Sequence, residues 1–291
     1  MPSRRTLVLT ASPSPHALPG LQRRADAEGE ARETTDVAVR AALETASLAT
    51  AIVLGEGDQL QRAEVLGWIR QARSAGARAV AVETTGHVLA RQGTAAQLKA
   101  AGLTHVFVAL FGADAASHDW VVGAPGSFDR SLRGLKQARA AGLRTQLLIP
   151  ILRPTFRALP DLIRRSLAIR VHGFEFRAPI GPDRVAHGLH PHLALAGPFV
   201  ARAVQIARAA KRSAWTWGVP ACVLGDAADA MIERHGGQTV IDAATPTGED
   251  YARTAGEPCK MCAWSAHCPG PLASYGYGFA GLLPRTDAPQ D

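Results

Sequence analysis

Short apolar runs alternate with longer helix-period stretches from Thr6 to about Arg177. The runs predict six strands, at Thr6–Thr10, Ala51–Leu54, Ala79–Glu83, His105–Leu110, Arg144–Pro150 and Gly173–Arg177. Between the strands, apolar residues recur at a spacing of three and four, as in Val65, Ile69 and Ala72, which indicates helices with one buried face. Glycines at 76, 102 and 142 stand where such helices are expected to end.

This βα alternation predicts an α/β fold with a parallel sheet covered on both faces. Right-handed crossovers wind such units into a partial barrel or an open doubly wound sheet. No G-x-G-x-x-G follows the first strand and no P-loop motif occurs, which argues against the nucleotide-binding open sheets. We therefore expect a partial (β/α)6, TIM-like barrel over residues 1–212 and a smaller region over 213–291. In the remainder the pattern predicts helices at Pro198–Arg212 and Ala227–His235, with a short strand at Trp215–Pro220.

The composition favours a folded, soluble protein. Hydrophobic residues make up 47% and charged residues 20%, which supplies a core and lacks the charge excess of a disordered chain. No apolar run reaches the roughly 18 residues that span a bilayer, and the apolar run near the N-terminus is too short for a secretory signal. We therefore expect a cytoplasmic protein with no membrane partner. The net charge is +7, but the arginines are scattered, which favours an ordinary solvated surface over nucleic-acid binding.

The four cysteines are the most informative residues, because all lie in the last quarter of the chain. Cys259, Cys262 and Cys268 form a C-x2-C-x5-C pattern, and Cys222 is the remaining candidate for a fourth ligand. His267 is the substitute if Cys222 points elsewhere. Zinc and iron–sulfur clusters both accept such ligands, and the isolated upstream cysteine favours one 4Fe-4S cluster, with zinc as the alternative. Reduced structural cysteines are the competing interpretation.

Two further segments give a family resemblance. The stretch VALFGADAASHDWVVGAPGSFDRSLRGLKQARAAGL (108–143) resembles the fourth-strand signature of the radical SAM superfamily, and the cysteine loop with Tyr275, Gly278 and Pro284 is similar to its auxiliary-cluster loop of the SPASM or twitch kind. VLGEGDQL and ETTGHVLA lie where that family carries Gly-Gly-Glu-Pro and Thr-Asn-Gly. The resemblance implies a radical SAM-type barrel followed by a small iron–sulfur region, as in the members that mature peptides and cofactors.

The chain departs from this family at the catalytic cluster. Members bind that cluster through C-x3-C-x2-C after the first strand, whereas this loop places Ser14, Leu18 and Leu21 at the three positions. One serine, with His16 nearby, does not supply three ligands for a low-potential cluster. The resemblance therefore implies a degenerate member that makes no 5′-deoxyadenosyl radical and for which S-adenosylmethionine is not expected as a cofactor.

What remains of the SAM-site turn is Gly55, Glu56 and Asp58, which could keep a cofactor-binding role. The alternative is that Glu56 and Asp58 only complement the dipole at the N-terminus of the next helix. We also expect Leu18 and Leu21 to fold inward as an aliphatic plug near Leu54 and Leu110. His118 and Asp119 at the same rim favour a structural, hydrogen-bonded role. His187, His190 and His192 suit either a metal or solvent, and Trp215 and Trp217 are expected to cover the barrel mouth.

Three classes of function follow from this pattern. The first is a non-catalytic binding or assembly partner in peptide or cofactor maturation, which would hold a peptide substrate or pair with an active radical SAM enzyme. The second is an electron-transfer protein for such an enzyme, and the third is a non-radical enzyme that uses the remaining site. A zinc-knuckle α/β protein unrelated to the family is the further alternative.

Overall fold

A computed structural model describes residues 6–10, 37, 39–41, 43–44, 51–55, 58–179, 188–235, 239–242 and 252–289. The chain divides into two compact units. Unit 1 comprises residues 1–110, 119–147 and 238–248, and unit 2 comprises residues 111–118, 148–237 and 249–291. We describe each unit by itself.

Unit 1 is built on a parallel sheet. Its strands follow the order β8-β1-β2-β3-β4-β5, with β5 running on into unit 2. They are β1 (Thr6–Thr10), β2 (Ala51–Gly55), β3 (Ala79–Thr84), β4 (His105–Ala109), β5 (Arg144–Pro150) and β8 (Thr239–Asp242). Thr6 pairs with Ala51 and Ala51 with Ala79, so the strands start nearly level and their carboxyl ends share one edge.

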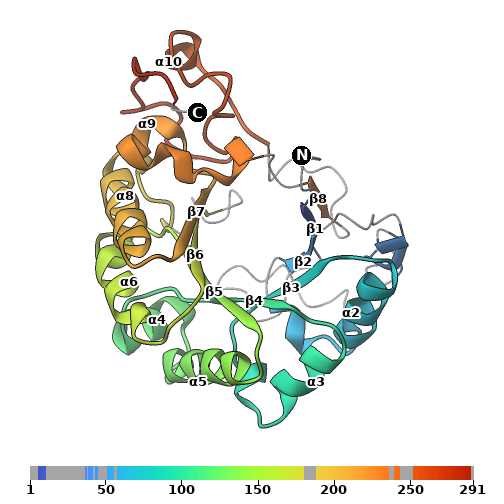
Figure 1. The fold of residues 1–291 in the computed structure, drawn as a ribbon. Helices are drawn as coiled ribbons and strands as arrows, with labels where there is room; N and C mark the ends of the chain where they lie inside the picture. The colour runs from blue at the N-terminus through green and yellow to red at the C-terminus, as the bar shows by residue number, and fades with distance from the viewer. Residues whose placement is uncertain are drawn as a thin grey trace. The chain divides into compact units, whose positions relative to one another are not determined.

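Helices α2 (Val65–Ser74), α3 (Thr94–Ala100) and α5 (Ser127–Ala140) line the outer side of strands β2 to β4 (Figure 1). The apolar spacing predicted this: α2 buries Trp68, Ile69 and Ala72. The sheet is buried on the other face as well, where Val53 and Ala81 pack with Phe107. Short 3-10 turns η2 (Gln59–Gln61) and η3 (Val88–Ala90) follow β2 and β3. Helix α4 (Ala115–Val122) belongs in part to each unit.

Unit 2 continues the parallel pattern with β6 (Gly173–Arg177) and β7 (Ser213–Trp217). Arg177 pairs with Trp217 at the carboxyl ends of these strands. The 3-10 turn η4 (Phe156–Ala158) leads into α6 (Leu159–Leu167), and α6 and α8 (Leu193–Ala209) cover the outer side of the strands (Figure 1). The remaining elements are short: α9 (Ala221–Leu224), the 3-10 turns η5 (Gly225–Ala230) and η6 (Ile232–His235), and α10 (Glu257–Lys260).

The six predicted strands and the predicted fold class are confirmed, since the chain forms the parallel half-barrel of a partial TIM-like fold. Four details differ. Strand β7 covers Ser213–Trp217, whereas the strand was predicted at Trp215–Pro220. Helix α8 begins at Leu193 and contains Pro198, at the cost of one main-chain hydrogen bond. The predicted helix Ala227–His235 is two 3-10 turns, because Met231 makes a β-bridge with Thr216 and interrupts it. Strand β8, a short Thr-Val-Ile run, was not predicted.

The predicted boundary between residues 1–212 and 213–291 stays a prediction, because the two compact units are each made of several chain segments and do not divide the chain at residue 212. None of the helices in the described residues combines the length and the hydropathy needed to cross a membrane.

Candidate functional site

Asp58 stands at the carboxyl ends of β2 and β3 in unit 1, where the altered SAM-site turn was predicted. Its side chain is buried, and one carboxylate oxygen accepts a 2.6 Å hydrogen bond from the Thr84 hydroxyl. The other oxygen accepts from the Thr85 hydroxyl and from Gln61 Nε2. The carboxylate therefore ties the turn after β2 to the turn after β3.

Gly55 ends β2 and is buried, and its carbonyl accepts a 2.8 Å hydrogen bond from Gln59 Nε2. Glu56 lies outside the described residues. Of the three residues expected at this turn, the two that are described make local hydrogen bonds, and a cofactor-binding role for them stays a prediction.

The Thr-Thr-Gly turn after β3 is held against α5 by two glycines. Gly86 has a φ of +85°, a conformation that favours glycine. A Cβ on Gly134 would lie 1.9 Å from the Gly86 carbonyl oxygen, so only glycine lets the helix approach this closely. The close approach fixes the turn that carries two of the partners of Asp58.

His118 and Asp119 also take structural positions. His118 is 1% exposed, and its Nδ1 accepts a 3.2 Å hydrogen bond from the Phe111 backbone N–H. Asp119 accepts from the backbone N–H groups of Gly126 and Phe128, at 2.6 and 2.8 Å, and so caps the start of α5. The signature that gave the family resemblance is therefore one of turn and helix geometry in this chain.

All four cysteines lie in unit 2, and each is half-buried with a free thiol. Cys222 is in α9, Cys259 is in α10, and Cys262 follows in the turn that closes when its N–H donates to the Cys259 carbonyl at 3.2 Å. Cys268 comes after a second turn around Trp264, where the N–H of Cys268 donates to the Trp264 carbonyl. Two short turns thus present the C-x2-C-x5-C residues.

The sulfur atoms are set among main-chain donors and among one another. The Ala221 N–H donates to Cys268 Sγ at 3.4 Å, and the Arg285 N–H donates to Cys262 Sγ at 3.3 Å. Burial raises the pKa of Cys222 to about 12, and the charges of Cys268, Cys262 and Cys259 add to the rise. Burial also raises the pKa of Cys268, against the opposing effect of its two main-chain donors.

Among the described residues, no three His, Cys, Asp or Glu side chains are arranged so that they could hold a single metal ion. The donor set itself fits an iron–sulfur cluster. Four thiols lie in unit 2, and main-chain N–H groups donate to two of the sulfurs, a second-shell arrangement of the kind that stabilises bound thiolates. His267 is exposed to solvent.

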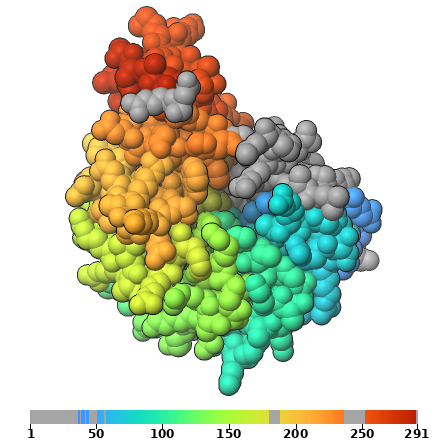
Figure 2. Space-filling view, in the orientation of Figure 1, coloured from blue at the N-terminus to red at the C-terminus, as the bar shows by residue number. Residues whose placement is uncertain are grey.

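The loop that carries Cys259–Cys268 lies next to α9 (Figures 1 and 2). The Tyr275 hydroxyl oxygen accepts a 2.7 Å hydrogen bond from the Leu193 N–H at the start of α8. Burial raises the pKa of Tyr275 to about 12. Leu193, Tyr275 and Leu282 form a small apolar cluster, with Cys222 packed against it. One modest core therefore supports the cysteine region.

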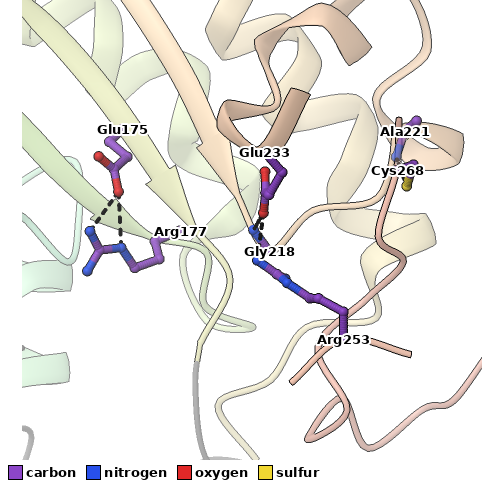
Figure 3. A network of polar contacts seen from close by, with 7 residues as sticks. All are labelled: Glu175, Arg177, Gly218, Ala221, Glu233, Arg253 and Cys268. Atoms are coloured by element: carbon purple, nitrogen blue, oxygen red, sulfur yellow. Dashed lines mark hydrogen bonds and ion pairs between the residues drawn. The ribbon is translucent and has the colours of Figure 1, made fainter. Parts of the chain in front are cut away.

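A buried polar network, which sequence reasoning missed, lies at the ends of β6 and β7 (Figure 3). Glu175 pairs with Arg177 at 2.7 Å, and Glu233 pairs with Arg253 at 2.6 Å while accepting from the Gly218 N–H. The Arg253 guanidinium lies 4.4 Å from the centroid of the Trp217 ring. That Trp215 and Trp217 cover the barrel mouth stays a prediction. Burial raises the pKa of Glu233 although Arg253 opposes the rise. For Glu175 and Arg177 the available signal was their alternation with phenylalanines in β6; no such pattern marked Glu233 and Arg253.

The other candidates are dispersed. His190 is 2% exposed, His192 packs against the Tyr277 ring, and Trp215 packs edge-on against His235. His187 lies outside the described residues, as do Ser14, His16, Leu18 and Leu21. The aliphatic plug therefore stays a prediction, although Leu54 and Leu110, which were expected to receive it, are both buried.

Comparison with known proteins identifies the class. Residues 22–165 match the sequence profile of the radical SAM superfamily, so the chain carries a radical SAM superfamily domain. It is 31% identical over 113 residues to the AdoMet-dependent heme synthase of Nitratidesulfovibrio vulgaris, covering 39% of this chain and 30% of that protein. It is 32% identical over 152 residues to the AdoMet-dependent heme synthase of Methanosarcina barkeri, covering 51% of this chain and 43% of that protein. The matches span less than half the length of these relatives.

Solved structures share the fold at low sequence identity. Native anSMEcpe with bound AdoMet superposes with a TM-score of 0.59 and 12% identity, covering 96% of this chain and 93% of that one. Streptococcus suis SuiB bound to S-adenosylmethionine gives 0.62 and 11%, covering 97% and 76%. SuiB bound to the precursor peptide SuiA gives 0.56 and 11%, covering 93% and 70%. The likeness establishes a radical SAM-type fold.

Proposed function

We propose that this chain is a radical SAM-like iron–sulfur protein that holds one 4Fe-4S cluster on Cys222, Cys259, Cys262 and Cys268 and does not generate the 5′-deoxyadenosyl radical. Its role on this proposal is that of a non-catalytic binding or assembly partner in peptide or cofactor maturation. The observation that carries the proposal is the distribution of the cysteines: all four lie in unit 2, and the sequence has none before residue 222.

The electrostatics of Cys222 support its place as the fourth ligand. The three cysteines of the C-x2-C-x5-C loop all raise its pKa, whereas His267, the substitute ligand, is solvent-exposed. A buried thiol with a raised pKa is unreactive until a metal displaces its proton, and such displacement couples metal binding to the folding of this region. Bound there, a cluster would supply one-electron chemistry or structural support, and the four thiolates would leave none of its irons open.

The SAM site is degenerate in both of its parts that can be compared. Ser14, Leu18 and Leu21 replace the three thiolates, and the match to the superfamily profile starts only at residue 22, beyond these positions. Asp58 and Gly55 at the altered turn are already bonded to Thr84 and Gln59. Both observations support a scaffold kept without its radical-generating centre.

The choice of peptide or cofactor maturation rests on the neighbours. SuiB has been solved with a precursor peptide, and the curated relatives are named as enzymes that make heme. On this proposal, a chain with this fold and no radical centre binds such a substrate and presents it to an active enzyme.

Metal and sulfide analysis after anaerobic purification tests the cluster, with an electron paramagnetic resonance spectrum of the reduced protein. We expect about four irons and four sulfides per chain and a signal that disappears in Cys222→Ala, while exposed Ser265→Ala keeps both. Stoichiometric zinc without labile sulfide would overturn the cluster. For the partner role, a co-purification assay with an active radical SAM enzyme and its precursor peptide should give a complex with one of them, and binding to neither would count against it.

Electron transfer to a partner is the second candidate, and one observation favours it. Met261, between two of the ligands, is 81% exposed, so this edge of the site lies close to solvent. A redox titration separates the two roles: an electron carrier needs a cluster that is reduced and reoxidised reversibly, and a cluster that cannot be reduced without loss of iron would exclude this candidate.

A further inference from the structure

We propose that Arg285 is a positioning residue for the cluster, joining the chain segment of Cys222 to the loop of Cys262 and Cys268 and setting the charge beside them. The inference rests on the proposed function, which it deepens. Nothing in the sequence pattern singled this residue out, because it lies well past the cysteines in an irregular segment.

The contacts of Arg285 reach both ligand-bearing segments. Its backbone N–H donates to Cys262 Sγ at 3.3 Å. Its guanidinium Nη1 donates to the carbonyls of Gly225 and Ala221, at 2.5 and 3.4 Å, one on each side of the short helix that carries Cys222. Arg285 thus donates directly to the sulfur of Cys262 and also holds both ends of the helix that carries Cys222.

The same clamp touches the third sulfur indirectly. Ala221, whose carbonyl Arg285 holds, donates its own N–H to Cys268 Sγ at 3.4 Å. A shift of Arg285 would therefore move the donors of two sulfurs together. Second-shell donors of this kind orient metal ligands, and their loss commonly weakens metal binding by about ten- to a hundred-fold.

The guanidinium is itself held in place. Its Cζ lies 4.7 Å from the centroid of the Trp264 ring, and its Nε donates to Asp287 Oδ1 at 2.9 Å. Trp264 is 4% exposed and donates its Nε1–H to the Asp287 carbonyl at 2.9 Å. Arg285, Asp287 and Trp264 therefore form a closed set of contacts that joins the segment of residues 285–287 to the cysteine loop.

These contacts need the planar fork of arginine. The side chain serves two carbonyls and a carboxylate and stacks on an indole, which a lysine ammonium cannot do at once, although lysine keeps the charge. A lysine variant therefore separates geometry from charge.

Charge gives the proposal a second, independent consequence. A positive group beside a cluster stabilises the more negative, reduced form, and Asp287 partly cancels that effect. Arg285→Ala should shift the reduction potential to more negative values, and Asp287→Asn should shift it to more positive values. A purely structural role would not predict opposite signs.

The test uses the full chain with its cluster and four variants: Arg285→Ala, Arg285→Lys, Asp287→Asn and the control Arg164→Ala. Arg164 makes an exposed ion pair with Asp161 in unit 2. The measurements are the rate of iron loss to a chelator and the midpoint potential by redox titration. We expect roughly ten-fold faster iron loss in Arg285→Ala, an intermediate rate with a nearly unchanged potential in Arg285→Lys, and wild-type behaviour in the control.

Iron loss from Arg285→Ala at the wild-type rate, or potentials that shift in the same direction in Arg285→Ala and Asp287→Asn, would overturn the proposal. If Arg285→Ala does not fold, the lysine and asparagine variants still decide it. A wild-type chain that binds no iron and sulfide contradicts the proposed function, whereas a loaded wild type with indifferent variants contradicts only the role of Arg285.

Discussion

The turns around Asp58 in unit 1, called here the polar rim, and the cysteine loop of unit 2 are the two candidate sites, and they are built differently. At the rim, the oxygens of Asp58 are bonded to Thr84, Thr85 and Gln61, all on turns held by regular elements. In the cysteine loop, short turns present thiols, and main-chain N–H groups donate to the sulfurs of Cys262 and Cys268.

At the polar rim the protein itself supplies the hydrogen-bond partners of the carboxylate. In the cysteine loop a bound metal centre would supply partners for the thiols. A carboxylate with every oxygen bonded inside the protein has little to offer a cofactor. Thiols with raised pKa values and few partners gain most when a metal replaces their protons. The contrast predicts that the rim tolerates the absence of a ligand and that the loop does not.

The largest expected effect is in the cysteine loop. Cys262→Ala should abolish iron and sulfide binding and bleach the brown colour, and it should expose residues 252–289 to protease, because the apolar cluster that supports them is small. Metal analysis and limited proteolysis measure both, with exposed Ser265→Ala as the matched control. A variant that retains a full cluster would remove Cys262 from the ligand set.

The second prediction concerns S-adenosylmethionine. Because no thiolate stands at Ser14, Leu18 or Leu21, we expect no 5′-deoxyadenosine after reduction with dithionite, and calorimetric titration should show no heat of binding. Cleavage above background would mean that the radical site lies elsewhere or is completed by a partner. A micromolar dissociation constant would refute the aliphatic plug and restore a nucleotide-binding role to the rim.

A third change probes the rim as a structural element. Asp58→Ala leaves the buried Thr84 hydroxyl without its partner and should lower the free energy of unfolding by about 2 kcal/mol. Chemical denaturation measures this, and the exposed Asp161→Ala should change stability by less than about 0.5 kcal/mol. Iron content should be unchanged in both. Loss of iron in Asp58→Ala would contradict the separation between rim and loop.

The smallest expected effect is at the anchor of the cysteine loop. Tyr275→Phe removes the acceptor for the Leu193 N–H at the start of α8 and should cost about 1 kcal/mol while the ring packing stays. Tyr277→Phe is the matched control, since Tyr277 is 39% exposed and its hydroxyl makes only a 3.5 Å contact with the His190 carbonyl. Equal stability of the two variants would show that Tyr275 acts through its ring alone.

Periodicity was sufficient for the half-barrel because strands buried on both faces produce continuous apolar runs. It failed at β8, whose four residues are too few to show a period, and at Ala227–His235, where a β-bridge from Met231 overrides the local helical spacing. Both failures come from pairing with distant residues.

At the sites, sequence reasoning found the residue types with strong spacing and missed those without it. The cysteines are recognisable because four of them share one region. Arg285 and the pair Glu233 and Arg253 act through contacts between segments far apart in the chain, and single arginines are too common here to stand out.

The contact between Gly86 and Gly134 has a genetic consequence. Every other amino acid carries a Cβ, which at position 134 would collide with the main-chain carbonyl oxygen of Gly86. A substitution of Gly134 therefore disrupts the packing, and because the collision is with main chain, a second substitution at Gly86 cannot relieve it. The constraint on this position comes from the packing of the fold and does not depend on the reaction. It lies, with His118 and Asp119, inside the segment that matches the superfamily profile, so part of that match reflects how α5 packs against the turn after β3.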